Sequence, residues 1–552
     1  MPKKIKLLDE LRNLLSEKQQ AELFALFMQG SDHDDTDKQQ AALQKIIKPL
    51  DWEKYRQQIG KLLAEQLPLE QLVPEIYADW RPIIRESVIY IGTHLSMTRL
   101  IPKLFEQVLL PETTTQEQRL LTFIEQMPTL QKLGQVIARN RNLSSEFRAV
   151  LIQLENGIRD ISVPTICAQI EQELGARLKQ HHVELEELIH AEASVCALMR
   201  FSWLNPQTQQ HEHGVFKVLK PHIKDNFAEE ISLLNGLASH LEANKEHVLD
   251  DVNLNETFTE IGSLLEQELN TLQEQANLSM AYECYRDVPG IRVPQFIQEL
   301  STHDITAMHF EKGIKVTDAF IKQPTQRYKL SAQIIESLIA TPLFAAEEEA
   351  PFHADPHAGN LFVDETTHDL IVFDWALTGR LNREERRKII MLFMAVTLRD
   401  ETLLLESLTG LSQGKLSQDK AKQLKHRITS FIKQLSVYKL PGVNDVLSLT
   451  DDLLLMGIRF SPALMLFRKV LLTLDGVLHD MGDQIAIEMV IANYVMQQLG
   501  NEMVGINLWQ QVRPNFQLPL SGNDAFSLMW SAQWYYFRTG WQNSEQLLKQ
   551  YR

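Results

Sequence analysis

Apolar residues recur along most of the chain at the spacing of an α-helix. The pattern covers residues 5–29 and continues to about residue 110, where the polar segment 111–118 interrupts it. It resumes over 119–190 and again from residue 382 to the end of the sequence. Because this spacing places apolar side chains on one face of each helix, it predicts long helical blocks on both sides of a central region.

Within the central region the apolar runs are shorter and typical of β-strands. Residues 190–203 and 213–221 flank a polar loop that contains proline, which predicts a β-hairpin. The remainder predicts helices over 225–245 and 256–287 and two short strands within 291–310. A few strands between helical blocks indicate an α+β core with helical extensions.

A second predicted hairpin carries a cluster of polar side chains at one end, in the sequence FHADPHAGNLFVDETTHDLIVFDW. Its apolar runs, LFVD and LIVF, are joined by a five-residue polar connection, a length that suits a hairpin. If Asp364 pairs with Leu370, the antiparallel register places Asn360 opposite Asp374. Directly opposed residues have Cα atoms roughly 4.5–5.5 Å apart, so these two side chains would converge.

An asparagine and an aspartate at one end of a hairpin suit Mg²⁺, which binds few protein oxygens and keeps positions for water and phosphate. Asp355 lies in the loop that enters the same end, where a further carboxylate can orient or deprotonate an attacking hydroxyl. The order Asp355, Asn360, strand, turn, strand and Asp374 is that of protein-kinase-like phosphotransferases. The alternative is that Asp355 and Asn360 only cap turns.

The segment HADPH also allows a metal-hydrolase interpretation, because His353 and His357 lie four residues apart. A zinc site of that kind requires a helix through both histidines. Pro356, between them, opposes a helix at this point, so the sequence favours the nucleotide site.

A kinase-like site also needs a strand lysine that holds the nucleotide phosphates. The run GVFKVLKP supplies Lys217 among apolar neighbours, where an unpaired buried ammonium would be costly. The alternative is an edge position from which the lysine reaches solvent. The later predicted helix offers Glu266, Glu268 and Glu274 as partners, unless it is simply a solvent-exposed acidic helix.

Composition narrows the class of protein. The 552 residues carry a formal net charge of −17, which disfavours nucleic-acid binding because phosphate contacts need a basic face. The three cysteines, Cys167, Cys196 and Cys284, are widely separated and predict free thiols in a reducing compartment. No apolar run approaches the ~18 residues of a membrane span, and the N-terminus lacks a signal-peptide pattern, so we expect a cytoplasmic protein that can touch a membrane surface.

Taken together, the motifs resemble the UbiB/AarF family of atypical protein-kinase-like proteins over about residues 120–480. The segment MPTLQKLGQ is similar to the family's Lys-x-Gly-Gln signature, and AEASVCALMR to its alanine-rich nucleotide loop. GVFKVLKP resembles the lysine strand and EQELNTLQEQAN the acidic helix, including Glu274 and Asn277. FHADPHAGN and FDW resemble the catalytic and metal loops.

This resemblance implies a two-lobed kinase-like core with a small β-containing N-lobe and a helical C-lobe. It further implies an extension, carrying the Lys-x-Gly-Gln signature, that folds over the active site. The expected organisation is a helical N-terminal region over 1–118, the helical extension over 119–190, the N-lobe and hinge over 191–312, and the C-lobe with a helical tail over 313–552.

The resemblance also implies roles for individual residues, with ATP and Mg²⁺ as cofactors. Asp355 would be the catalytic aspartate, Asn360 and Asp374 the metal ligands, and Lys217 the residue that holds the phosphates. The expected nucleotide-binding residues are Lys217 with its partner Glu268, Ala193 and Ser194 of the loop, Lys132 and Gln135 of the extension, and Met308 near the hinge.

Several positions depart from the family's pattern. Ala197 replaces a glutamine of the nucleotide loop, and Asn270 replaces an aspartate near the lysine's partner. His309 stands at the usual hinge glutamate, and Ala376 stands where the metal loop of ordinary kinases has glycine, which restricts φ.

The implied function is that of an ATP-dependent phosphotransferase or ATPase in ubiquinone or other isoprenoid-lipid metabolism, with a lipid or quinone-precursor ligand. A pseudokinase that works as a nucleotide-dependent scaffold is one alternative. An aminoglycoside-phosphotransferase-like small-molecule kinase is another, although that group lacks the Lys-x-Gly-Gln extension. Near the C-terminus, aromatic residues of 526–541 share one helical face, which predicts either core packing or peripheral membrane contact.

Overall fold

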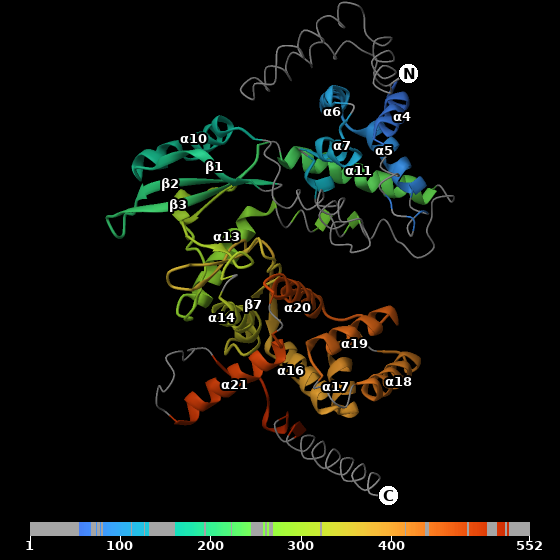
Figure 1. Ribbon diagram of the computed structural model, residues 1–552, viewed down its shortest axis with the longest axis vertical. Helices are drawn as coiled ribbons and strands as arrows, with labels where there is room; N and C mark the ends of the chain where they lie inside the picture. Colours follow the sequence, from blue (N-terminus) through green and yellow to red (C-terminus); the bar gives the residue numbers. More distant parts are fainter. Residues whose placement is uncertain are drawn as a thin grey trace, which may run out of the picture. The chain divides into compact units, whose positions relative to one another are not determined.

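The computed structural model divides the chain into two compact units (Figure 1). The first unit contains residues 1–272 and 297–310, and the second contains 273–296 and 311–552. The structure describes residues 55–131, 161–243, 258–504 and 516–528, except for parts of 68–80 and the short gaps 112, 126, 193–194, 222, 260–261, 264–265, 267–268, 321–322, 415, 436–440, 483–484 and 525–526.

A four-stranded antiparallel sheet forms the centre of the first unit. Its strands follow the order β1 (Glu184–Glu192), β2 (Cys196–Leu204), β3 (His211–Leu219) and β5 (Ile305–His309). Helix α10 (Val163–Gln180) lies beside these strands (Figure 1) and buries its apolar stripe against them. Alternate residues of β2, such as Met199 and Phe201, point into this core, as period-two patterning requires.

The hairpin predicted over 190–221 is confirmed as β2 and β3, but the helix predicted up to residue 190 ends earlier. His182 takes a left-handed φ of 48° just after α10, and β1 begins at Glu184. β1 pairs with β2, with Leu185 opposite Phe201. The sequence of β1 contains four glutamates and suits a helix equally well, so pairing with a buried neighbouring strand overrides the local preference.

Helices of the N-terminal region also belong to the first unit. They are α4 (Arg56–Gln66), α5 (Arg81–His94), α6 (Met97–Leu109) and α7 (Gln116–Ile124), and they share a core cluster with Leu233 of α11 (Ile223–Ala243). Arg99 of α6 pairs with Glu229, at 2.9 Å, and with Glu230 of α11. The backbone N–H of Thr129 donates to Glu230 Oε2 at 2.8 Å. The segment that precedes Lys132 is therefore anchored to the same helix as the N-terminal layer.

Two small sheets lie in the second unit. One follows the order β4 (Ile291–Arg292), β9 (Leu370–Val372), β8 (Leu361–Val363) and β6 (Ile314–Lys315). The other pairs β7 (Glu349–His353) with β10 (Thr378–Asn382). The strands predicted within 291–310 are confirmed as β4 and β5, whereas β7 and β10 had no clear alternation in the sequence.

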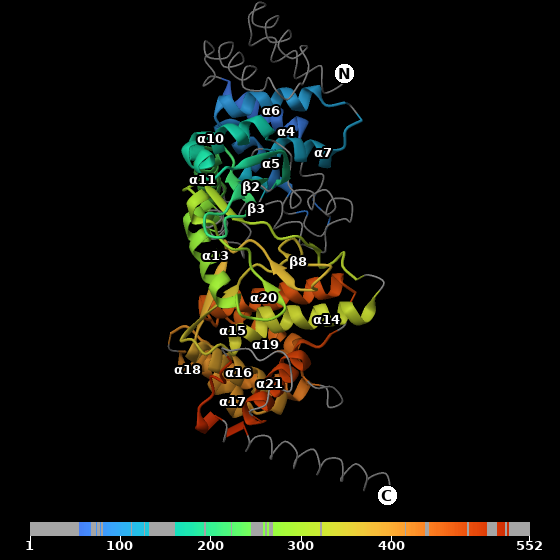
Figure 2. The same cartoon turned by 90° about the vertical axis from the view of Figure 1, so that its left-hand side faces the viewer.

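Helices make up most of the rest of the second unit, as the periodicity predicts. α13 (Thr271–Tyr285) leads into the unit, and α14 (Pro324–Ile335) continues through a π-helical turn, Glu336–Ala340, into α15 (Thr341–Leu343). Figure 2 shows the later helices gathered beside one another: α16 (Arg383–Leu398), α17 (Glu401–Leu411), α18 (Gln418–Gln434), α19 (Val443–Leu455), α20 (Pro462–Asp480) and α21 (Ile487–Val504).

Across the described ranges, none of the helices combines the length and the hydropathy that a bilayer span requires. The described cysteines Cys167, Cys196 and Cys284 are all free, as their separation predicts.

Candidate functional site

His353, the last residue of β7, joins the two loops that carry the predicted site in the second unit. Its Nε2 lies 3.0 Å from the carbonyl oxygen of Phe373, and the backbone N–H of Asp355 donates to its Nδ1 at 3.2 Å. One nitrogen therefore donates and the other accepts, which is the pattern of a neutral imidazole. The ring is fully buried, and burial lowers the pKa of His353 below its ordinary value. A neutral histidine thus holds the Asp355 loop against the Asp374 loop.

Asn360 makes a second connection inside the same loop. The side-chain Nδ2 of Asn360 donates to the backbone carbonyl oxygen of Asp355 at 3.2 Å. The backbone carbonyl oxygen of Asn360 accepts from the N–H of Phe373 at 2.9 Å. The side chain is largely buried. Because the amide nitrogen is committed to Asp355, the side-chain oxygen is left as the atom that can bind a cation.

The hairpin of β8 and β9 is confirmed, but its predicted register is wrong by one residue. Val363, and not Asp364, pairs with Leu370, so Asn360 lies opposite Phe373. The cause lies in the turn, where Asp364 leaves the strand and its Oδ1 accepts from the N–H of Thr366 at 2.7 Å. An aspartate that bonds its own backbone two residues on favours a turn over a strand position.

The backbone turns sharply at Asp374, shortly after the end of β9. Asp374 has φ of 56°, a left-handed conformation that aspartate tolerates better than most residues. The next residue, Trp375, is fully buried, and its Nε1 donates to Val372 O at 3.2 Å. Asn277 of α13 donates to Trp375 O at 3.1 Å. These contacts fix the loop on both sides of the exposed Asp374 side chain.

Charges around Asp355 complete the arrangement. The carboxylates of Asp355 and Asp374 both lie near enough to His353 to oppose the lowering of its pKa. Lys469 of α20 places its Nζ 2.8 Å from Asp355 Oδ1, and His357 Nε2 lies 3.7 Å from Oδ2. The sequence interpretation missed Lys469, because nothing in a helical run so far along the chain indicates that it reaches this loop.

The donor set suits a hard cation bound by few protein atoms. Asn360 supplies an amide oxygen and Asp374 a carboxylate, which matches the ligand preference of Mg²⁺. Over the part of the chain that the structure describes, no group of three or more histidine, cysteine or acidic side chains could hold a metal ion. His353 and His357 do not lie on a helix, and both nitrogens of His353 have partners, so the metal-hydrolase alternative is not supported.

Lys217 lies in the first unit, on β3, which is one of the two inner strands of the four-stranded sheet. It is opposite Leu198 of β2 and Thr306 of β5. Its neighbours Phe216 and Val218 point into the core that α10 covers, so Lys217 points to the opposite face of the sheet. The lysine therefore lies within a central strand rather than at an edge.

A second lysine of the same segment is buried beside the predicted nucleotide loop. Lys220 Nζ lies 2.9 Å from Glu192 Oε1, and side-chain exposures are 7% and 4%. The N–H of Lys220 also donates to Val195 O at 2.9 Å. These contacts join the two ends of the segment that contains Ala193 and Ser194 to the end of β3.

The structure describes only some of the other predicted residues. Met308 lies on β5 opposite Val215, Glu274 is buried on α13, and Glu266 is exposed to solvent, as the acidic-helix alternative holds. Several predictions fall outside the described residues: Lys132, Gln135, Ala193, Ser194, Glu268 and the aromatic positions of 526–541.

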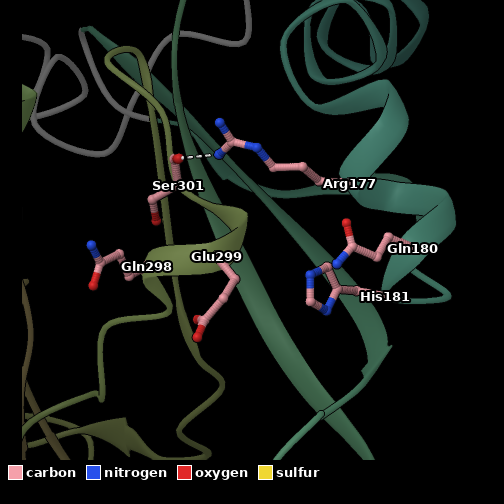
Figure 3. A pocket seen from close by; sticks show the side chains of 6 residues that line it. All are labelled: Arg177, Gln180, His181, Gln298, Glu299 and Ser301. Atoms are coloured by element: carbon pink, nitrogen blue, oxygen red, sulfur yellow. Dashed lines mark hydrogen bonds between the residues drawn. The ribbon is translucent and has the colours of Figure 1, made fainter.

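A cavity of about 590 Å³ lies elsewhere on the first unit, between the end of α10 and the short helix Gln298–Leu300. Figure 3 shows Arg177, Gln180 and His181 on one side and Gln298, Glu299 and Ser301 on the other. Arg177 Nη1 donates to the carbonyl oxygen of Ser301 at 2.9 Å. None of the predicted site residues lines this cavity.

The structure thus holds the Asp355 loop, the Asn360 amide and the Asp374 loop together at one end of a hairpin, in the chain order that protein-kinase-like phosphotransferases use. Residues 153–408 match the family model described as the ABC1 atypical kinase-like domain. The resemblance to the UbiB/AarF family is thereby confirmed, and the fold is an α+β, kinase-like one.

Curated relatives agree with this assignment. The chain is 24% identical to the chloroplastic protein ACTIVITY OF BC1 COMPLEX KINASE 7 of Arabidopsis thaliana, over 70% of this chain and 55% of that protein. It therefore spans just over half of that relative. It is 25% identical to a probable protein kinase UbiB of Actinobacillus pleuropneumoniae, over 69% of this chain and 70% of that protein. A UbiB of Histophilus somni is 26% identical, over 68% and 70%.

Among solved structures, the complex of Rv3197 with erythromycin from Mycobacterium tuberculosis is a remote neighbour. It covers 72% of this chain and 97% of its own, with a TM-score of 0.42 and 14% sequence identity. Nothing about the chemistry of this chain follows from so distant a likeness.

Proposed function

We propose that this protein binds Mg-ATP and acts as an atypical kinase or ATPase. The observation that carries the proposal is the convergence of Asp355, Asn360 and Asp374 around buried His353 at one end of the β8–β9 hairpin. Kinase-like relatives support the class of activity.

In this proposal the chain's own residues divide the work as follows. Asn360 and Asp374 would hold the metal ion, which when bound neutralises charge on the phosphate oxygens. Lys217 would hold the nucleotide phosphates, with Glu268 as its partner. Asp355 would accept the proton of the acceptor hydroxyl or water while the new phosphorus–oxygen bond forms and the bond to ADP breaks.

The remaining predicted residues belong to the surroundings of the nucleotide. Ala193 and Ser194 would form the loop over the phosphates, and Met308 would contact the nucleotide near the hinge. Lys132 and Gln135 would reach into the site from the extension. The name UbiB among the relatives supports an isoprenoid-lipid or quinone precursor as the acceptor or ligand, on a protein at a membrane periphery.

Nucleotide binding is tested by thermal stabilisation with ATP and ADP, each with and without Mg²⁺. A ligand present at 100 times its Kd stabilises the folded state by about 2.7 kcal/mol, enough to shift the melting temperature measurably. We expect a Mg²⁺-dependent shift in the wild type and its loss in Asp374→Asn.

Asp369→Asn is the matched control, because Asp369 lies in the turn at the opposite end of the same hairpin. It should keep the full shift. If no nucleotide stabilises the wild type, or if Asp374→Asn keeps the shift, the proposal is wrong. Turnover is then measured as phosphate release, alone and with a polyprenylated phenol in lipid vesicles.

A further inference from the structure

Lys469, which lies beyond the end of the match to the domain model, places a cation against the predicted catalytic carboxylate. Its Nζ lies 2.8 Å from Asp355 Oδ1, whereas the domain match ends at residue 408. Exposed fractions of 35% for the Lys469 side chain and 23% for Asp355 leave both groups partly open to water.

Helix α20 holds Lys469 in a defined place. Ser461 caps the helix by accepting from the N–H of Leu464, and Pro462 occupies its first turn. Phe467 is buried and meets the ring of Phe352 edge to face, with centroids 5.5 Å apart. Since Phe352 directly precedes His353 on β7, the helix that carries Lys469 packs against the strand that carries the Asp355 loop.

The backbone N–H, the backbone carbonyl oxygen and Oδ1 of Asp355 each have a partner from a different direction. His353 accepts from its N–H, Asn360 donates to its carbonyl oxygen, and Lys469 faces one carboxylate oxygen. The first two fix the backbone of the residue. Lys469 is the nearer of the two side chains that face the carboxylate, at 2.8 Å from Oδ1, whereas His357 Nε2 lies 3.7 Å from Oδ2.

We propose that Lys469 is a positioning residue of the phosphotransfer site, which acts by orienting the Asp355 carboxylate toward the acceptor hydroxyl. The inference rests on the proposed function, because it assigns Asp355 the role of proton acceptor. It extends the functional site beyond residue 408 to α20.

Magnitudes separate this role from a purely structural ion pair. Partly exposed ion pairs contribute little to stability, because water screens both charges. A misplacement of a reacting group by about 1 Å, in contrast, can lower a rate about 100-fold. Loss of Lys469 should therefore change turnover far more than it changes the free energy of unfolding.

The experiment compares ATP turnover, Mg-ATP affinity and thermal unfolding in the wild type, Lys469→Met and Lys469→Arg. We expect Lys469→Met to lower kcat about 10- to 100-fold with KM and Mg-ATP affinity changed by no more than about twofold, because the metal ligands are untouched. Lys469→Arg should restore part of the rate, since it keeps the charge.

Arg468→Met is the matched control on the same helix. Arg468 pairs with Asp451 and not with the site, so its loss should leave kcat within about twofold of the wild type. The double variant Lys469→Met with Asp355→Asn should be no slower than Asp355→Asn alone, because residues that act as a unit are not additive.

The outcomes separate the two proposals. Equal kcat in Lys469→Met and wild type, or additive losses in the double variant, overturns the role of Lys469 while the proposed function stands. If the wild type binds Mg-ATP but does not turn it over, the Lys469–Asp355 pair is only a structural contact and the positioning role is wrong. A wild type that binds no nucleotide overturns the proposed function itself.

Discussion

At the scale of single residues, His353 shows how burial and hydrogen bonding serve a site without touching a substrate. It is fully buried and satisfies both the Phe373 carbonyl and the Asp355 N–H. An apolar ring of similar size would fill the same space but leave these backbone groups unpaired. Each buried group left without a partner costs about 1–3 kcal/mol.

His353→Phe should therefore lower the free energy of unfolding by about 2–5 kcal/mol and abolish stabilisation by Mg-nucleotide. Equilibrium unfolding in denaturant measures the first effect and thermal shift the second. His357→Phe is the comparison, because His357 is partly exposed and its ring contacts only its own loop, at the Gly359 N–H and, at 3.7 Å, at Asp355 Oδ2. If His353→Phe lost no more stability than His357→Phe, the conclusion that His353 holds the two loops together would be wrong.

Lys103 gives a prediction on pH. Its ammonium is buried, donates to Phe123 O and Glu125 O at 2.6 Å each, and burial lowers its pKa from 10.5 to about 8. Between pH 8 and 10.5 the unfolded chain therefore keeps a proton that the folded protein has lost. Stability contributed by this residue must rise with pH across that window.

From pH 8 to 10.5, we expect the free energy of unfolding of the wild type to rise by up to about 3 kcal/mol relative to that of Lys103→Met. Denaturant unfolding at a series of pH values measures it. Lys61→Met, at an exposed position of α4, should track the wild type throughout. A flat difference for Lys103→Met would show that the lysine keeps its proton.

At the scale of elements, the β7–β10 pair supports the site through a close approach that only glycine allows. Gly379 lies opposite Phe352, and a Cβ on Gly379 would come within 2.1 Å of that ring. The ring cannot easily retreat, because it is packed against Phe467 of α20. Gly379→Ala should lower stability by about 1–3 kcal/mol, as overpacking does.

Gly476→Ala provides the opposite case, because a Cβ on this helical glycine meets nothing within 4 Å. It should raise stability by up to about 1 kcal/mol, the helix-propensity difference between glycine and alanine. Thermal unfolding of both variants tests the argument. Equal melting temperatures for the two would mean that β7 and β10 are not packed as described.

How well each element could be predicted depended on whether its pattern was local. The helices after residue 382 and the hairpins β2–β3 and β8–β9 followed from periodicity. β1 did not, because its glutamate-rich sequence becomes a strand only through pairing with β2. The register of β8 and β9 was missed by one residue because the side chain of Asp364 closes a turn that periodicity does not describe.

At the scale of the whole molecule, the N-terminal helices of the first unit are part of its core. Ile83 of α5 packs with Leu237 and Leu241 of α11, and Arg99 neutralises buried Glu230. A chain that begins at residue 126 would lose this cover, which would expose the apolar face of α11 and remove the cation that pairs with Glu230.

We therefore expect the chain beginning at residue 126 to aggregate or to bind a hydrophobic dye, as size-exclusion chromatography and dye fluorescence would show. A chain that begins at residue 55 keeps every contact named above and serves as the control. If the shorter chain is monodisperse and unfolds at the wild-type temperature, the N-terminal helices are a separable domain.

By itself, the sequence determined the chemistry that is available: an aspartate, an asparagine and a second aspartate around a hairpin, a lysine in an apolar strand, free thiols and an acidic net charge. These follow from residue identity and short-range spacing. Only the tertiary structure decided which distant groups meet them. His353 joins two loops, Asn277 holds the Asp374 loop and Lys469 reaches Asp355, because packing brings together segments far apart in the chain. Contacts of this kind leave no periodic trace along a single sequence.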